Sequence, residues 1–203
     1  MDKSFKRIIG LTGGIATGKT IVSSYIKQNF NIPILDADIY ARDAIKINSN
    51  IFKLIQKRYG KNICLRNGEL DYQKLGNILF HDVKQKEWLE NKIHPYVKQV
   101  FTKEIRKSNT KVLIFDLPLL FESKLTFLIT EVWIVYCDQK EQLRRLINRN
   151  CLTKNEGIIR IKNQLSFKDK IDKADYVLDN SSTLANLYVQ INKIIEETNL
   201  YLR

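Results

Sequence analysis

The sequence predicts an α/β fold in which a five-stranded parallel sheet is wrapped by helices. Five short apolar runs are typical of buried strands, and helical patterns separate them along the chain. The last four runs each lead into an aspartate, which places carboxylates at the edge where α/β sheets bind ligands. The expected strands span residues 7–11, 31–35, 111–115, 132–137 and 174–178.

A glycine-rich loop follows the first expected strand. Residues 13–20 match the pattern G-x-x-x-x-G-K-[ST] in full, and apolar residues at helical spacing come next, at Val22, Tyr25 and Ile26. A strand, this loop and a helix in that order are the context that a phosphate-binding loop requires. The chance alternative is a glycine-rich turn before a helix, which the full pattern and both flanks disfavour.

Such a loop binds the phosphates of a nucleoside triphosphate together with Mg²⁺. Its backbone N–H groups converge on an anion, and the positive end of the helix dipole adds to the attraction. We expect Lys19 to reach the β- and γ-phosphates and the Thr20 hydroxyl to ligate Mg²⁺. The expected ATP-binding residues of the loop are Gly13, Gly14, Ile15, Ala16, Thr17, Gly18, Lys19 and Thr20.

Composition places the chain among ordinary globular proteins. Its 203 residues are 44% hydrophobic, which is enough for a substantial core. No apolar run approaches the ~18 residues of a membrane helix, so we expect no membrane partner. The charged N-terminus and the short apolar strand after it do not match a signal peptide. Three cysteines without a C-x-x-C pair indicate reduced thiols, and hence a cytoplasmic chain.

The net charge of +12 raises the question of nucleic acid. The lysines and arginines are spread along the chain, with no dense basic tract and no base-stacking motif beside them. We therefore expect no nucleic-acid partner. ATP and a phosphorylated acceptor are small polyanions that account for part of the charge. The sequence leaves a monomer and a weak homo-oligomer both open.

Two stretches interrupt the alternation of strands and helices. The first, residues 40–109, has the size of a helical substrate-binding insertion. Asp71 is expected to cap one helix through Phe80, Asp82 to cap a longer one, and Pro95 to kink or break that second helix. The second stretch, residues 148–173, is helical and basic, as expected of a lid over ATP. The core of this single domain then comprises residues 1–39, 110–147 and 174–203.

Two carboxylates follow the second strand. Asp36 and Asp38 lie on the same side if the chain stays extended there, so one can accept the proton of an attacking hydroxyl. The alternative is that one of them caps a helix that begins near Ile39. Asp116 ends the third strand and can hold Mg²⁺, directly or through water. Its alternative role is a hydrogen bond to the backbone of the phosphate loop.

Further basic residues are candidates for phosphate contacts. Arg145 and Arg149 lie four positions apart on one face of an expected helix and can clamp a transferred phosphoryl group, although exposed helix arginines are common. His94 precedes Pro95, and a lone histidine is more often structural than functional.

These motifs, taken in order, resemble the dephospho-CoA kinase family. The resemblance covers residues 8–180, nearly the whole chain. Its landmarks are Leu11-Thr12-Gly13-Gly14-Ile15 with Gly18-Lys19-Thr20, Asp36-Ala37-Asp38 with Ala41-Arg42, Ile93-His94-Pro95, Pro118-Leu119-Leu120-Phe121-Glu122, Arg145 with Arg149, and Ala174-Asp175-Tyr176-Val177-Leu178-Asp179-Asn180.

The resemblance implies transfer of the ATP γ-phosphate to the ribose 3′-hydroxyl of dephospho-CoA, the last step of coenzyme A biosynthesis. It also implies a P-loop kinase sheet, a helical CoA-binding insertion and a lid. Asp38 becomes the expected base, with Lys19 and Arg145 as catalytic cations and Arg149 in the ATP site. Thr12, Arg42 and His94 become candidates for the acceptor site, together with Asp38.

The chain departs from the family pattern at three positions. Ala16 stands where the family generally has glycine, and it is mildly strained if that position needs a positive φ. Asn150 replaces the aspartate that usually follows the lid arginine, so any salt bridge made there is absent. Ser166 replaces a usual proline, which is expected to loosen the lid.

Two other functions stay open on the residues alone. A different small-molecule or nucleotide kinase would share the same loop and sheet. A P-loop switch protein that binds nucleic acid or regulates a partner is the other alternative. Against a GTPase, the sequence has no Asn-Lys-x-Asp signature, because the two Asn-Lys-Ile triplets end in His94 and Ile195.

Overall fold

The computed structural model describes residues 6–123 and 125–200 and divides the chain into two compact units. One unit comprises the described residues up to 35 and from 109 onward, and the other comprises residues 36–108. In the first unit the elements are β1 (Arg7–Gly13), α1 (Lys19–Phe30), β2 (Ile34–Asp36, whose last residue opens the second unit), β3 (Val112–Asp116), the 3₁₀ turn η2 (Thr126–Leu128), β4 (Glu131–Tyr136), α6 (Gln139–Asn150), α7 (Lys154–Lys162), α8 (Phe167–Ile171), β5 (Tyr176–Asp179) and α9 (Leu184–Glu197).

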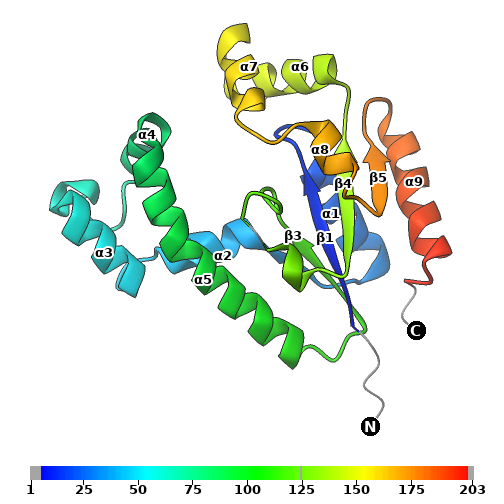
Figure 1. Ribbon diagram of the computed structural model, residues 1–203, viewed down its shortest axis with the longest axis horizontal. Helices are drawn as coiled ribbons and strands as arrows, with labels where there is room; N and C mark the ends of the chain where they lie inside the picture. The colour runs from blue at the N-terminus through cyan, green and yellow to red at the C-terminus, as the bar shows by residue number, and fades with distance from the viewer. Residues whose placement is uncertain (1–5, 124, 201–203) are drawn as a thin grey trace. The chain divides into compact units, whose positions relative to one another are not determined.

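The five strands form one sheet in the order β2-β3-β1-β4-β5. Figure 1 labels β3, β1, β4 and β5 in that order. β1 is central and pairs in parallel with both β3 and β4, and β4 pairs in parallel with β5. The register sets Leu11 beside Asp116 and Gly13 beside Val135. The ends of β3 and β4 therefore flank the point at which β1 enters the glycine-rich loop.

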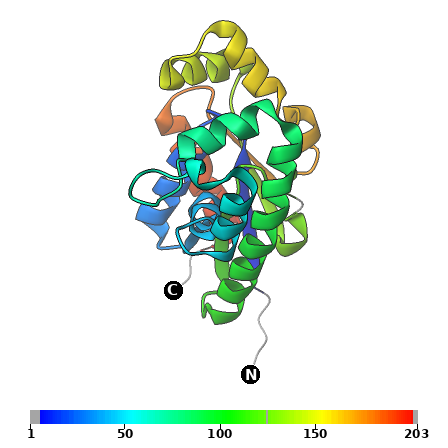
Figure 2. The same cartoon turned by 90° about the vertical axis from the view of Figure 1, so that its left-hand side faces the viewer.

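Apolar side chains bury both faces of this sheet. On one face α1 and α9 cover the strands, and the core includes Ile9, Val22 and Ile191, of which Val22 lies on α1 and Ile191 on α9. On the other side α8 packs against β4. The helices α6 and α7 pack on each other at one end of this unit. Both helices are at the top of Figures 1 and 2. No helix among residues 6–123 and 125–200 is long and apolar enough to cross a membrane.

All five expected strands and their parallel arrangement are confirmed, with shifted ends. The largest shift is in the second strand, which was expected at residue 31 and starts at Ile34. The helix before it runs to Phe30, and Asn31 then turns the chain with a φ of 52°. Pairing with the sheet begins only where the Ile114 N–H donates to the Pro33 carbonyl, at 3.0 Å.

The second unit is helical, as expected for the insertion. It contains α2 (Ala37–Ala44), α3 (Asn50–Tyr59), the 3₁₀ turn η1 (Lys61–Ile63), α4 (Tyr72–His81) and α5 (Val83–Lys107). The predicted caps are confirmed, because Asp71 accepts from Lys74 N–H and Asp82 accepts from the N–H groups of Lys84 and Gln85. Its own apolar core includes Phe52, Ile55, Leu75 and Leu89.

Pro95 was expected to kink or break the long helix, and the break is wrong. α5 continues as one helix from residue 83 to residue 107, with Pro95 inside it. Proline removes one backbone donor and its ring clashes with the preceding turn, at a cost of about 3 kcal/mol, although its fixed φ is compatible with a helix. Buried side chains on both sides of it, Leu89 before and Val97 and Phe101 after, hold the helix against the rest of the unit.

Candidate active site

The phosphate loop joins the end of β1 to the start of α1. Gly18 is the N-cap of α1 with a φ of 98°, a left-handed conformation that glycine adopts without cost. A Cβ at Gly18 would lie 2.2 Å from Nδ2 of Asn180. The second glycine of the motif is therefore fixed both by its backbone angle and by the side chain that packs on it.

Hydrogen bonds inside the loop and from β5 hold its backbone. Thr17 donates to the Gly14 carbonyl through both its N–H, at 3.3 Å, and its hydroxyl, at 2.9 Å. The buried Asn180, directly after β5, donates from Nδ2 to the Thr17 carbonyl at 2.7 Å. Asn180 is one of the landmarks of the family resemblance, but no local pattern in the sequence indicates its contact with the loop.

Ala16 has a φ of 61°, as the sequence analysis anticipated for a position where glycine is usual. A residue with a Cβ loses about 1–2 kcal/mol in the left-handed conformation. The loop therefore contains one strained residue, and contacts elsewhere must hold it.

Lys19 and Asp116 form an ion pair between the loop and the sheet. Lys19 is the first residue of α1 and Asp116 the last of β3. The side chains are 15% and 5% exposed, so both charges are largely removed from water. Asp116 thus contacts the lysine side chain, which neither of its expected roles named. Its carboxylate holds Lys19 at the edge of the loop, where phosphates would bind.

The oxygen donors around the loop fit Mg²⁺. The Thr20 hydroxyl lies on the first turn of α1, and the Asp116 carboxylate lies beside the adjacent Lys19. Mg²⁺ prefers oxygen ligands and usually takes one or two from the protein, with phosphates and water completing its shell. In the described part of the chain no group of three or more His, Cys, Asp or Glu residues is arranged to hold a metal by itself.

Arg145 is connected to the phosphate loop by hydrogen bonds through Asn180. Arg145 on α6 donates from one guanidinium nitrogen to the Asn180 carbonyl at 2.9 Å and from Nε to Glu141 at 2.7 Å. Hydrogen bonds from Arg144 and then from Arg145 lower the pKa of Glu141 to about 2. Glu141 is thus a fixed negative charge that orients Arg145, while Arg144 remains exposed.

Arg149 lies one turn further along α6 and is exposed. Its Nε donates to Oδ1 of Asn150 at 3.0 Å. The position that departs from the family pattern therefore still contacts the arginine, through a hydrogen bond to a neutral amide instead of a salt bridge. Ser166, another departure, is the N-cap of α8 and accepts from the Asp169 N–H, so it stabilises the start of that helix.

The acidic pair after β2 divides into two roles. Asp36 is the N-cap of α2 and accepts from the Asp38 N–H at 2.8 Å. Asp38 lies in the first turn of α2 and is exposed, and Arg42 lies in its last turn. One member of the pair therefore caps a helix, which begins two residues before Ile39. His94 is half-buried within α5, one residue before Pro95.

Thr12 is fully buried at the end of β1. Its hydroxyl donates to the Pro118 carbonyl at 3.4 Å. The contact joins β1 to the turn that follows β3, so Thr12 supports the loop from within the sheet.

A phosphate loop between the first strand and first helix of a five-stranded parallel sheet defines a P-loop kinase. The fold agrees with solved P-loop kinases, among them a shikimate kinase from Bacteroides thetaiotaomicron with a TM-score of 0.55, 15% identity and coverage of 95% of this chain and 98% of that one. The model of the dephospho-CoA kinase family matches residues 7–186. The chain belongs to the dephospho-CoA kinase family.

Individual relatives agree with the family match. A dephospho-CoA kinase of Nostoc sp. is 50% identical over 187 residues, 92% of this chain and 95% of the relative. One of Listeria innocua is 40% identical over 193 residues, 94% and 96% of the two chains. The solved dephospho-CoA kinase from Campylobacter jejuni has a TM-score of 0.72 and 25% identity, covering 96% of this chain and 98% of that one.

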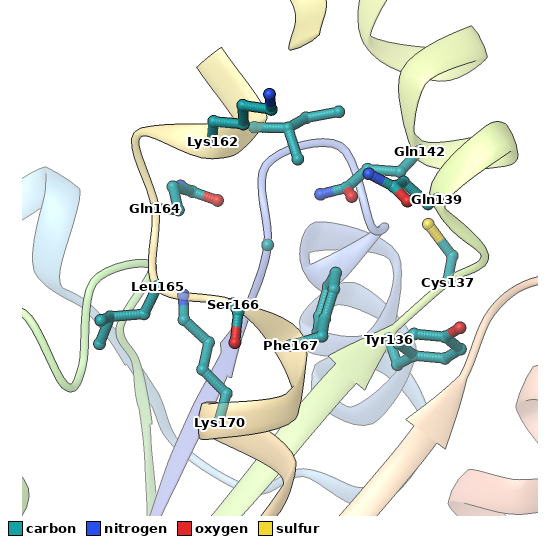
Figure 3. A pocket seen from close by; sticks show the side chains of 12 residues that line it. Tyr136, Cys137, Gln139, Gln142, Lys162, Gln164, Leu165, Ser166, Phe167 and Lys170 are labelled. Atoms are coloured by element: carbon teal, nitrogen blue, oxygen red, sulfur yellow. The ribbon is translucent and has the colours of Figure 1, made fainter. Parts of the chain in front are cut away.

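The free thiol of Cys137 lies in a cavity of about 450 Å³ beside Gly14 of the loop, shown in Figure 3. Burial raises the pKa of this thiol to about 11, whereas Cys151 at the end of α6 is exposed. Only the thiolate is nucleophilic, and a raised pKa keeps Cys137 protonated at pH 8. Peptide mapping after iodoacetamide treatment at pH 8 should therefore find Cys151 alkylated well before Cys137. A Cys151→Ser variant that still incorporates label rapidly at Cys137 would contradict this environment.

Proposed function

We propose that this chain transfers the γ-phosphoryl group of ATP to the ribose 3′-hydroxyl of dephospho-CoA, giving CoA and ADP in the last step of coenzyme A biosynthesis. The observation that carries the proposal is a complete phosphate loop, with Lys19 held at Asp116, in a chain half identical to a named dephospho-CoA kinase. The alignment covers 92% of the chain, so it includes most of the helical unit that we propose to bind the acceptor.

The loop would bind the ATP phosphates through backbone N–H groups between Gly13 and Thr20, of which those of Ile15 and Thr17 already donate within the protein, to Gln164 and to the Gly14 carbonyl. The start of α1 adds the positive end of a helix dipole at the same place. Lys19 supplies a full positive charge to the β- and γ-phosphates. Its ion pair with Asp116 fixes the direction in which it leaves the helix, so little reorganisation is needed when charge develops on the transferred group.

Asp38 would act as the base toward the acceptor. Its carboxylate accepts the proton of the 3′-hydroxyl while that oxygen attacks the γ-phosphorus, and the bond to the β–γ bridging oxygen breaks to release ADP. The cap at Asp36 supports this assignment, because it fixes the start of α2 and leaves the Asp38 side chain exposed.

Arg145 and Arg149 would neutralise charge on the phosphates. Arg145 is oriented by Glu141 and attached to Asn180, which also holds the Thr17 carbonyl of the loop. A guanidinium positioned in this way is suited to stabilise negative charge as it spreads over the transferred phosphoryl group. Arg149, exposed and one helical turn away, would contact ATP.

Mg²⁺ would be held by the Thr20 hydroxyl and by Asp116, either directly or through water. When bound, it neutralises charge on the β- and γ-phosphates. Asp116 already forms an ion pair with Lys19. Its carboxylate would then contact two cations, Lys19 and Mg²⁺, at the same edge of the sheet.

The acceptor would contact Arg42 and His94 as well as Asp38. Arg42 shares α2 with Asp38, and His94 lies on α5, which packs against α2. Thr12 is fully buried and its hydroxyl donates to the Pro118 carbonyl, so it would act on the acceptor site indirectly, by supporting the end of β1. The proposed partners are small molecules, and neither nucleic acid nor a membrane is among them. The chain would act in the cytoplasm as a monomer or a weak homo-oligomer.

An acceptor panel tests the proposed reaction. ADP release from Mg²⁺-ATP is measured with dephospho-CoA, AMP, CMP, adenosine and no acceptor, and the product is identified by mass. We expect ADP release only with dephospho-CoA, together with CoA, because a ribose hydroxyl and not a phosphate is the nucleophile. Release with AMP or CMP would keep the kinase fold and overturn the substrate. ATP binding without release for any acceptor would favour a switch protein.

Asp38→Asn tests the base. The amide cannot accept the proton, so kcat should fall by roughly 10²- to 10⁴-fold, the range of general base catalysis, while the ATP dissociation constant stays unchanged. Asp43→Asn is the matched control, because Asp43 lies on the same helix and pairs with Lys46. Steady-state kinetics with dephospho-CoA and calorimetry with ATP separate the two effects. Near-normal turnover of Asp38→Asn would show that another group takes the proton.

A further inference from the structure

Residue Ile15 of the phosphate loop has both of its backbone polar groups bound by side chains from distant parts of the chain. Its N–H donates to Oε1 of Gln164 at 2.8 Å, and its carbonyl accepts from Nε2 of Gln142 at 2.9 Å. Gln164 lies between α7 and α8, in the lid segment, and Gln142 lies on α6. In Figure 3 the two carboxamides flank the loop on opposite sides.

The two glutamines are themselves held in place. Gln142 is 2% exposed, and within the described residues its Oε1 has no hydrogen-bond partner. The Gln142 side chain therefore satisfies the Ile15 carbonyl through its amide nitrogen, while its amide oxygen has no partner in the described part of the chain. Next to Gln164, the Leu165 N–H donates to Glu122 at 3.4 Å, and the same carboxylate oxygen lies 3.1 Å from Nζ of the buried Lys170.

The residue after Ile15 is the strained Ala16, with a φ of 61°. The Ile15 carbonyl belongs to the peptide that joins Ile15 to Ala16, so the Gln142 contact fixes the orientation of that peptide. The Gln164 contact fixes the preceding peptide through its N–H. The peptide after Ala16 is held as well, because the Thr17 N–H donates at 3.3 Å to the Gly14 carbonyl, which belongs to the same peptide that Gln164 fixes. Ala16 therefore cannot relax to a negative φ without breaking at least one of these hydrogen bonds.

We propose that Gln142 and Gln164 are positioning residues for the phosphate loop, which hold Ile15 and so keep Ala16 in the left-handed conformation that ATP binding requires. The proposal depends on the role of the loop in the proposed function. Neither glutamine needs to touch a reactant. Because Gln164 belongs to the lid segment, the same contact ties the lid to the loop.

The test is a double-mutant cycle between Gln164 and Ala16, with ATP affinity measured by calorimetry in the absence of any acceptor. Gln164→Met keeps the side-chain length and removes the acceptor oxygen. Gln164 is only half-buried, so this variant should stay folded. We expect the ATP dissociation constant to rise by about 3- to 10-fold, the effect of one hydrogen bond.

Ala16→Gly separates positioning from a general loss of stability. Glycine adopts a positive φ freely, so in the Ala16→Gly background Gln164→Met should weaken ATP binding less than 2-fold. Gln85→Met is the matched control in the helical unit, where Gln85 accepts from Arg58 and Tyr59. It should leave ATP affinity unchanged.

Two results would overturn the proposal: unchanged ATP affinity in Gln164→Met, whether or not its melting temperature falls, or an equal loss of affinity in both backgrounds. Turnover of the unaltered chain with dephospho-CoA is measured alongside. If that turnover is absent while ATP still binds, the proposed reaction fails and the cycle still reports on the loop.

Discussion

The site depends on the ion pair between Lys19 and Asp116. It joins the first residue of α1 to the last residue of β3, across the loop that is expected to receive the phosphates. Both charges are largely buried, so removing one of them leaves the other without compensation, at a cost of about 3–5 kcal/mol. The pair therefore does two things: it fixes the lysine for phosphate binding, and it locks the start of the helix to the central part of the sheet.

The phosphate loop is also held by side chains from other parts of the first unit. Asn180 after β5 holds the Thr17 carbonyl, and the carboxamides of Gln142 and Gln164 hold Ile15. An ordinary residue at a left-handed position is tolerated when its surroundings determine the conformation. The departure at Ala16 is thus consistent with a working loop, because its neighbours are bound on both sides.

Local patterns predicted much of this molecule. The strands, the loop, and the caps at Asp71 and Asp82 follow from residues within a few positions of one another. The side chains that hold the loop do not, because Gln142, Asn180 and Gln164 contact residues 127, 163 and 149 positions away. Pro95 shows the opposite error, since a strong local signal for a helix break was outweighed by buried side chains on both sides of it.

The most direct measurement of the central claim is the turnover of Lys19→Gln with ATP and dephospho-CoA. Glutamine keeps a hydrogen-bond donor for Asp116 but loses the positive charge, so circular dichroism is used first to establish that the variant is folded. Lys27→Gln, at the exposed end of the same helix, is the control. The account predicts a loss of roughly 10²- to 10³-fold in kcat for Lys19→Gln and none for the control. A folded Lys19→Gln variant with turnover within a few-fold of the unaltered chain would contradict it.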